Sequence, residues 1–191
     1  MADLALRPAR VDAFGALPSL AHGSRFAATP VGPATRFVFR GRGPAIDAAA
    51  TAFGVALPRE ACRAAEAAER AALWLGPDEW LLLAPDGEGE AIAAAFRAIE
   101  APHSLVEVSH RNTAVTLSGS EVTKVIASGC PLDLHLTTFP VGMCTRTLYA
   151  KAEIVLWRRA VDRFRLECGR SFAPYVHGVL ADAAAEFAVA D

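Results

Sequence analysis

The residues whose side chains could most readily take part in catalysis or binding lie together between positions 106 and 112. Ser109 is followed directly by His110, a pair that could act as a nucleophile and its base. Neighbouring residues on a strand point to opposite faces, so these two are badly placed to share a hydrogen bond. The serine also lacks the Gly-x-Ser-x-Gly elbow of many hydrolases. We therefore predict a turn whose side chains bind backbone groups, with Arg111 available to a carboxylate on a partner.

A second polar cluster follows a predicted helix, between Gly129 and His135. Cys130 comes directly after the helix end, where the negative end of the helix dipole disfavours a reactive thiolate. Asp133 and His135 could supply two ligands to a metal ion, but the sequence offers no third ligand nearby. We therefore predict no catalytic residue and no metal site in this chain.

Regular elements must position these clusters, and the spacing of apolar residues predicts where the elements lie. Runs bounded by glycine and proline predict strands at 36–40, 71–75, 79–84, 104–108, 113–117, 145–149, 153–157 and 163–167. Helical spacing with terminating residues predicts helices at 44–53, 88–99 and 121–128, and a last helix that Ser171 caps and that runs to about Phe187. The expected apolar face of this last helix carries Tyr175, Val179, Leu180, Ala183 and Phe187.

The order of these elements repeats in the two halves of the chain. In the first half, predicted elements are bounded by Gly41, Gly54 and Pro58. The corresponding residues of the second half are Gly119, Gly129 and Pro131. A βαββα unit in each half predicts an α+β fold of duplicated, ferredoxin-like split βαβ units. A single open sheet with helices on one face is the alternative. We expect one domain at 36–191, with pseudo-repeats at about 36–108 and 109–187.

The first 35 residues show no sustained helical or alternating pattern and are rich in proline and glycine. Such a composition predicts an arm or loop rather than a core element. Leu17, Leu20 and Phe26 are nevertheless apolar. The arm should therefore pack either on its own domain or on another chain, and both possibilities remain open.

The composition of the whole chain excludes several classes of protein. Its 191 residues, 53% of them hydrophobic, suffice for a sizeable core. The formal net charge of −2 lacks the basic excess that binding to nucleic acid or an anionic membrane would need. Without an 18-residue apolar run or a secretory leader, we expect a cytoplasmic location. The four cysteines lack Cys-x-x-Cys spacing and are expected to be reduced thiols.

Five short motifs occur along the chain in a fixed order. They lie at 75–81 (LGPDEWL), 108–111 (VSHR), 129–134 (GCPLDL), 144–147 (CTRT) and 170–172 (RSF). Together they resemble the gamma subunit of heterotetrameric sarcosine oxidase. The likeness runs from about residue 36 to residue 187, and the arm at 1–35 contributes almost nothing to it.

The resemblance implies a role within a complex. The chain is then expected to be a small, cofactor-free subunit of a bacterial flavoenzyme. That enzyme demethylates sarcosine, passes the one-carbon unit to tetrahydrofolate and makes hydrogen peroxide. The resemblance also implies that FAD, FMN, NAD, tetrahydrofolate and zinc are bound by other subunits, and that the partners are the large and flavin-binding subunits. The gamma fold is similar to the folate-binding domain of the glycine-cleavage aminomethyltransferase. The family offers no catalytic residue to carry over.

Several polar residues of the five motifs form no recognisable site, so we expect some of them, together with the arm, to contribute to the surface that meets a partner. These residues are His110, Arg111, Asp133, Arg146 and Arg170. Arginine suits interface ion pairs because its planar guanidinium can donate two hydrogen bonds to one carboxylate. Two other interpretations remain open: a stand-alone folate-binding protein of one-carbon transfer, and a homo-oligomeric scaffold without a ligand.

Overall fold

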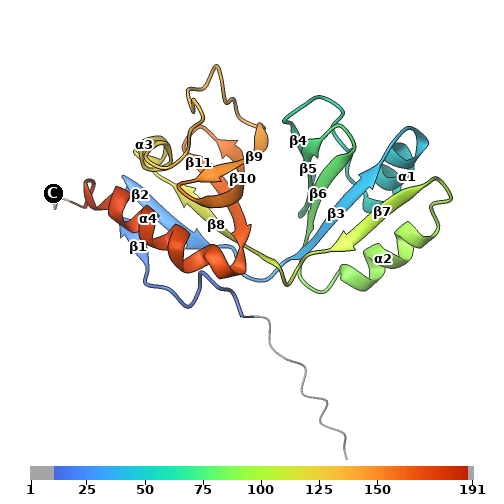
Figure 1. The fold of residues 1–191 in the computed structure, drawn as a ribbon, viewed down its shortest axis with the longest axis horizontal. Coiled ribbons are helices and arrows are strands. Elements are labelled where there is room, and N and C mark those ends of the chain that lie inside the picture. Colours follow the sequence, from blue (N-terminus) through green and yellow to red (C-terminus); the bar gives the residue numbers. More distant parts are fainter. Residues whose placement is uncertain (1–10, 189–191) are drawn as a thin grey trace, which may run out of the picture.

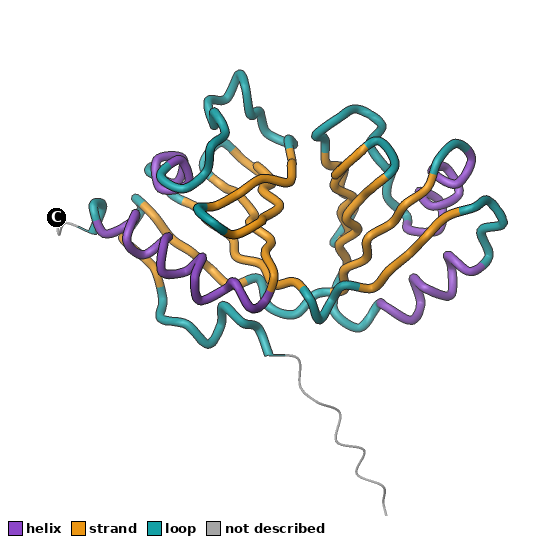
Figure 2. The backbone as a smooth tube through the Cα atoms, viewed as in Figure 1, coloured by secondary structure: helices purple, strands orange, loops and turns teal. Residues whose placement is uncertain are grey.

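Two antiparallel β-sheets face each other in the computed structural model, which describes residues 11–188. Helices cover the outer face of each sheet, as Figure 1 shows by element and Figure 2 by type of structure. The predicted α+β class is therefore correct. Residues 1–10 of the expected arm lie outside the described residues.

The first half of the chain forms a five-stranded sheet with the order β4-β5-β6-β3-β7. Its strands are β3 (Thr35–Gly41), β4 (Ala64–Ala67), β5 (Arg70–Gly76), β6 (Glu79–Ala84) and β7 (His103–Glu107). The helices α1 (Pro44–Phe53) and α2 (Gly89–Arg97) pack on its outer face, where Phe39, Phe53, Trp80 and Phe96 form the centre of an apolar core. Pro44 begins α1 and Gly54 ends it in the left-handed conformation, with φ of 77°.

The second half forms a six-stranded sheet with the order β1-β2-β8-β11-β10-β9. Its strands are β8 (Asn112–Ser118), β9 (Cys144–Tyr149), β10 (Ala152–Ala160), β11 (Arg163–Gly169), β1 (Leu20–His22) and β2 (Phe26–Pro30). The helix α3 (Val122–Ala127), the short 3₁₀ helix η1 (Arg170–Phe172) and α4 (Ala173–Ala185) complete this half. A second core lies between the sheet and α3 and α4.

The inner faces of the two sheets form a third, smaller core. Leu73, Leu81 and Leu83 of the five-stranded sheet lie in one cluster with Val155 and Trp157 of the six-stranded sheet. All five side chains are buried. Apolar contact therefore holds the two sheets together and positions every group that lies between them.

The expectation that residues 1–35 form only an arm or loop is wrong for the part that the structure describes. β2 pairs with β8 in antiparallel register, and Phe14 and Phe26 are buried in the core beneath α4. The backbone at Arg25 comes close to Gly119, which directly follows β8. Gly119 has a φ of 122°, and a Cβ added there would overlap the carbonyl of Arg25. Residues 11–35 thus pack on their own domain, and hydrogen bonding to β8 supplies the order that the sequence pattern lacks.

The last helix begins later than predicted, and most of its predicted apolar face is confirmed: Leu180 and Phe187 are buried, and Val179 and Ala183 are partly buried against the same core. Ser171 lies in η1 and is exposed, and Phe172 precedes the helix without a side-chain cap. The buried residues of α4 are Ala173, Val176, Leu180 and Ala184, whereas Tyr175 is 39% exposed. Apolar residues surround most of this helix, so helical spacing alone does not single out one face.

Candidate functional site

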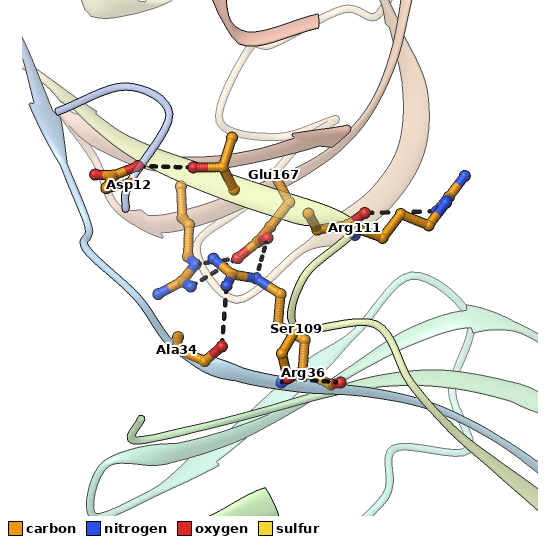
Figure 3. Close-up of polar contacts among 9 residues, drawn as sticks. Asp12, Ala34, Arg36, Ser109, Arg111 and Glu167 are labelled. Carbon is orange, nitrogen blue, oxygen red and sulfur yellow. Dashed lines mark hydrogen bonds and ion pairs between the residues drawn. The ribbon is translucent and has the colours of Figure 1, made fainter. Parts of the chain in front are cut away.

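A buried ion pair joins the two sheets, and Figure 3 shows its surroundings. Arg36 on β3 donates from Nε to Glu167 Oε2 on β11 over 2.7 Å. The two side chains are 2% and 1% exposed. Arg36 Nη1 also donates to the carbonyl of Ala34 over 3.2 Å. Breaking such a pair would leave a buried charge uncompensated, so this contact fixes how the sheets meet.

Arg165 brings a second cation to the same carboxylate. Its Nε and Nη2 donate to Glu167 Oε1 over 2.9 and 2.6 Å, so each oxygen of Glu167 binds an arginine. The two residues are two positions apart on β11 and therefore share one face of the sheet. Within residues 11–188, Arg36 Nη2 is buried and has no hydrogen-bond partner. The three side chains together carry one more positive charge than negative charge.

Ser109 is part of this junction rather than a nucleophile. Its Oγ accepts a hydrogen bond from the backbone N–H of Arg36 over 2.9 Å and donates to Glu107 Oε1 over 2.8 Å. The residue is 6% exposed, whereas His110 is exposed. The predicted turn whose side chains bind backbone groups is therefore confirmed at Ser109.

Four of the five predicted partner residues lie around the same junction. Arg111 and Arg146 line one pocket between the sheets, with a volume of about 190 Å³, together with Phe172. His110 and Arg170 line a smaller hollow beside Arg36. These four residues come from three motifs, and the packing of the two halves brings them together.

The four residues differ in how firmly the chain itself holds them. Arg170 Nη1 donates to the carbonyl of Val11 over 2.7 Å and so holds the arm at that residue. Arg146 forms an ion pair with Glu79 of the other sheet, with 2.6 Å between Nη2 and Oε1. Arg111 is exposed, and its one side-chain hydrogen bond within residues 11–188 runs from Nη1 to Asn112 Oδ1 over 3.5 Å. Among the three arginines, Arg111 is therefore the one most available to another molecule.

Asp133 lies apart from the junction, in the loop between α3 and β9. Its carboxylate accepts hydrogen bonds from the backbone N–H of His135 and from Thr138 Oγ1, each over 2.9 Å. These two hydrogen bonds hold the pKa of Asp133 below its usual range, despite a small opposing effect of desolvation. Asp133 thus stabilises a turn of this loop in its ionised form.

A buried arginine that the sequence analysis did not single out holds the same loop in place. Arg158 on β10 donates from Nη1 to the carbonyls of Leu134 and Phe139, over 2.9 and 2.7 Å, and from Nη2 to the carbonyl of Val161 over 2.8 Å. Its guanidinium also lies over the ring of Phe164, 4.7 Å from the centroid. Desolvation by burial lowers the pKa of Arg158. Arginine is so rarely buried that the sequence alone predicts a surface residue here.

Three cysteine thiols are buried and all four are free, as predicted for reduced thiols. Desolvation by burial raises the pKa of Cys144 and that of Cys168 to about 12 in each case. Both groups therefore stay protonated at neutral pH and react slowly with electrophiles in solution. Across residues 11–188, no group of three or more His, Cys, Asp or Glu side chains could hold a metal ion. In that same range, every helix is too short or too polar to cross a membrane.

Comparison with known proteins places this fold and these motifs in a family. The model of the sarcosine oxidase gamma subunit family matches residues 41–186. The sarcosine oxidase subunit gamma of an Arthrobacter species is 34% identical over 142 residues, which cover 74% of this chain and 70% of the relative. The chain belongs to the sarcosine oxidase gamma subunit family. A second gamma subunit, from Corynebacterium sp. (strain U-96), is 31% identical over 145 residues.

Solved structures agree with the family membership. A chain of the heterotetrameric sarcosine oxidase from Corynebacterium sp. U-96, in complex with pyrrole 2-carboxylate, matches with a TM-score of 0.80 and 30% identity. The match covers 91% of this chain and 90% of that chain. The glycine cleavage system aminomethyltransferase T from Bartonella henselae matches with a TM-score of 0.64 at 13% identity, over 83% of this chain and 46% of that one. At this identity, the likeness of the gamma subunit family to the aminomethyltransferase concerns the fold alone.

Proposed function

We propose that this chain is the accessory gamma subunit of a heterotetrameric sarcosine oxidase. The observation that carries the proposal is the match along nearly the whole chain to a chain of such an oxidase. In this proposal, FAD, FMN, NAD, tetrahydrofolate and zinc are bound by other subunits, where sarcosine is demethylated. The partners are then the large and flavin-binding subunits, in the cytoplasm.

The chemistry of this chain supports an accessory role. The hydroxyl of Ser109 is engaged by backbone and carboxylate groups, and two buried thiols have a raised pKa. Two pockets lined by both sheets, of about 190 and 290 Å³, are smaller than the roughly 300–1,000 Å³ of typical small-molecule sites.

We propose that the surface that meets the partner includes His110, Arg111, Asp133, Arg146 and Arg170. Arg111 contributes most to binding because its guanidinium is exposed and only weakly engaged within the chain. Arg146 and Arg170 contribute mainly by holding neighbouring segments in place. A carboxylate on the partner is the group that Arg111 would bind.

We also propose that the two halves are duplicated split βαβ units within one domain, at about 36–108 and 109–187. The neighbouring order β5-β6-β3-β7, with α1 and α2 as the connections, supports this arrangement in the first half. In the second half, the order β10-β11-β8 corresponds to β5-β6-β3 of the first half. β2 from the arm lies beside β8, in the position that corresponds to that of β7 beside β3. The arm then completes the second unit.

Co-expression tests the proposed function. A tagged form of this chain is produced with the large and flavin-binding subunits, and sarcosine-dependent formation of peroxide is compared with and without it. We expect a yellow complex to co-purify and the activity to disappear when the chain is omitted. A colourless chain that elutes alone, with full activity in its absence, would contradict the proposal; binding of tetrahydrofolate or self-association by that chain would favour the folate-binding or scaffold alternative.

Charge reversal tests the proposed surface within the same complex. The Arg111→Glu variant should lower the affinity for the other subunits roughly tenfold or more, because a carboxylate on the partner would then face another carboxylate. Its melting temperature as an isolated chain should stay within about 2 °C of the wild type. Arg163→Glu, an exposed change at the start of β11, is the matched control. Equal loss of affinity in both variants would refute a specific role for Arg111.

A further inference from the structure

A short backbone bridge links the two halves away from their covalent connections. Arg63, in the segment before β4, pairs with Met143, which precedes β9, as an isolated antiparallel bridge. Ala64 N–H donates to the carbonyl of Gly142 over 2.9 Å on one side of this bridge. Cys144 N–H donates to the carbonyl of Cys62 over 3.0 Å on the other side.

This bridge places two cysteines opposite each other. In antiparallel pairing, the residues that flank a bridged pair face each other across it, so Cys62 lies opposite Cys144. The hydrogen bond from Cys144 N–H to the carbonyl of Cys62 brings the two backbones together, and a disulfide needs Cα atoms only about 4.4–6.8 Å apart. The thiol of Cys62 is also close enough to Cys144 to contribute to the raised pKa of Cys144, after the larger effect of desolvation.

The two cysteines have different environments. Cys144 is fully buried, and its Sγ contacts the carbonyl of Trp74 at 3.6 Å. Cys62 is partly exposed and has a φ of 60°, a backbone conformation that is uncommon for any residue except glycine. Because Cys144 remains protonated and shielded, Cys62 is the sulfur that a dissolved oxidant reaches first.

We propose that Cys62 and Cys144 are a redox-active pair that hydrogen peroxide converts into a disulfide between the two halves of the molecule. The sulfur of Cys62 first attacks a peroxide oxygen, the O–O bond breaks, and one water and a sulfenic acid on Cys62 result. The sulfur of Cys144 then attacks the sulfur of Cys62, the S–O bond breaks, and a second water leaves with the proton of Cys144. The two thiols lose two hydrogens and two electrons, and peroxide accepts both.

The remaining thiols make a natural internal control. Cys130 and Cys168 are buried in the separate core beneath α3 and α4. Neither belongs to the bridge between residues 62–64 and 142–144. Peroxide at limiting concentration should therefore leave both of them as thiols.

The experiment treats the purified full-length chain with one equivalent of hydrogen peroxide and then alkylates the remaining thiols. We expect a mass loss of about 2 Da before alkylation, two alkylated cysteines instead of four after it, a peptide that links residues 62 and 144 under non-reducing conditions, and reversal by a dithiol reductant. The melting temperature should rise by roughly 5–15 °C on oxidation. Cys62→Ser should abolish the linked peptide and the rise, and Cys168→Ala should retain both.

Other results would overturn the pair. Oxidation of Cys62 to sulfinic acid without a linked peptide would show that Cys144 does not resolve the sulfenic acid. A disulfide that involves Cys130 or Cys168 would place the reactive pair elsewhere. Cys62→Ser lies at a partly exposed position, so its folding, checked by circular dichroism, keeps the test valid even if a change at buried Cys144 unfolds the chain.

Discussion

Glu167 is the anion on which the junction between the sheets depends, since two arginines donate to it. The Glu167→Gln variant keeps the shape of the side chain but leaves Arg36 and Arg165 without a countercharge. We expect the free energy of unfolding to fall by about 3–5 kcal/mol, measured by urea denaturation.

Glu153→Gln serves as the control for this variant. Glu153 is 66% exposed and lies 3.9 Å from Arg146 Nε, so the change should alter stability by no more than about 0.5 kcal/mol. If Glu167→Gln were no more destabilising than this control, the buried ion pair would not be what orients the sheets.

Buried protonated groups make the chain sensitive to alkali. Desolvation raises the pKa of Cys144 and Cys168 from 9.0 to about 12 and that of Tyr149 from 10.0 to about 12. Above about pH 9, the unfolded chain loses protons that the folded chain retains, so the free energy of unfolding should fall as pH rises from about 9 to 12. Melting temperatures measured between pH 7 and pH 11 check this.

Tyr149→Phe isolates one part of this pH dependence. It removes the hydroxyl that donates to the carbonyl of Val125, so the variant should be less stable at pH 7 but lose stability less steeply above pH 10. A slope above pH 10 identical to that of the wild type would show that Tyr149 does not contribute.

Single residues were the hardest feature to predict from the sequence. The turn at Ser109 could be predicted because adjacent serine and histidine cannot cooperate on a strand. Arg36, Arg158 and Glu167 gave no such indication, because charged residues are expected at the surface. Their burial depends on partners that are distant in sequence, which the contact between Arg36 and Glu167 illustrates.

At the scale of elements, β2 is the strand whose contribution can be tested most directly. Phe26 at its start is fully buried beneath α4. Phe26→Ala should lower the free energy of unfolding by about 3–5 kcal/mol, because it leaves a cavity in a packed core. Thermal and urea denaturation measure the change.

A matched change in the same segment shows whether the loss is specific. Val11 is 60% exposed, so Val11→Ala should leave stability nearly unchanged. Equal stability of the Phe26→Ala variant and the wild type would mean that the arm adds nothing to the fold.

Elements with strong local patterns were predicted well, and elements stabilised only by tertiary pairing were missed. The strand at 36–40 and the helix at 44–53 match β3 and α1 because alternation, Pro44 and Gly54 all indicate the same boundaries. β1, β2 and β4 are short and lack such a pattern. They form because a neighbouring strand offers unpaired backbone groups.

At the scale of the whole molecule, the inner core between the sheets should make unfolding cooperative. Leu81 is 1% exposed and lies in one cluster with Val155 and Trp157 of the other sheet. Leu81→Ala should lower the free energy of unfolding by about 2–5 kcal/mol. Amide hydrogen exchange should then accelerate in β3 and also in β8, because both halves lose the shared core.

The opposite pattern would contradict this view of the molecule. Faster exchange confined to the five-stranded sheet would show that the halves unfold independently. Ala94→Gly, at an exposed position of α2, serves as the control because it weakens a helix without touching the inner core.

The class of the whole fold followed from the order of elements, whereas the way the halves meet did not. Local pattern predicts a βαββα series in each half, and the structure has two antiparallel sheets. That the sheets face each other through Leu81 and Trp157 depends on side chains from both halves. Local periodicity does not predict such contacts between distant residues. The motifs therefore indicated the family more readily than the surface that meets a partner.

The pairing of β2 with β8 has a consequence for the order in which a ribosome releases the chain. Phe26 emerges early, but Asn112–Ser118, against which its strand packs, emerges only after the entire five-stranded sheet has been translated. The first sheet can therefore assemble while the arm still lacks its partner strand. The arm then docks among the last steps, and a nascent chain arrested before β8 would carry an apolar N-terminal segment exposed to chaperones and proteases.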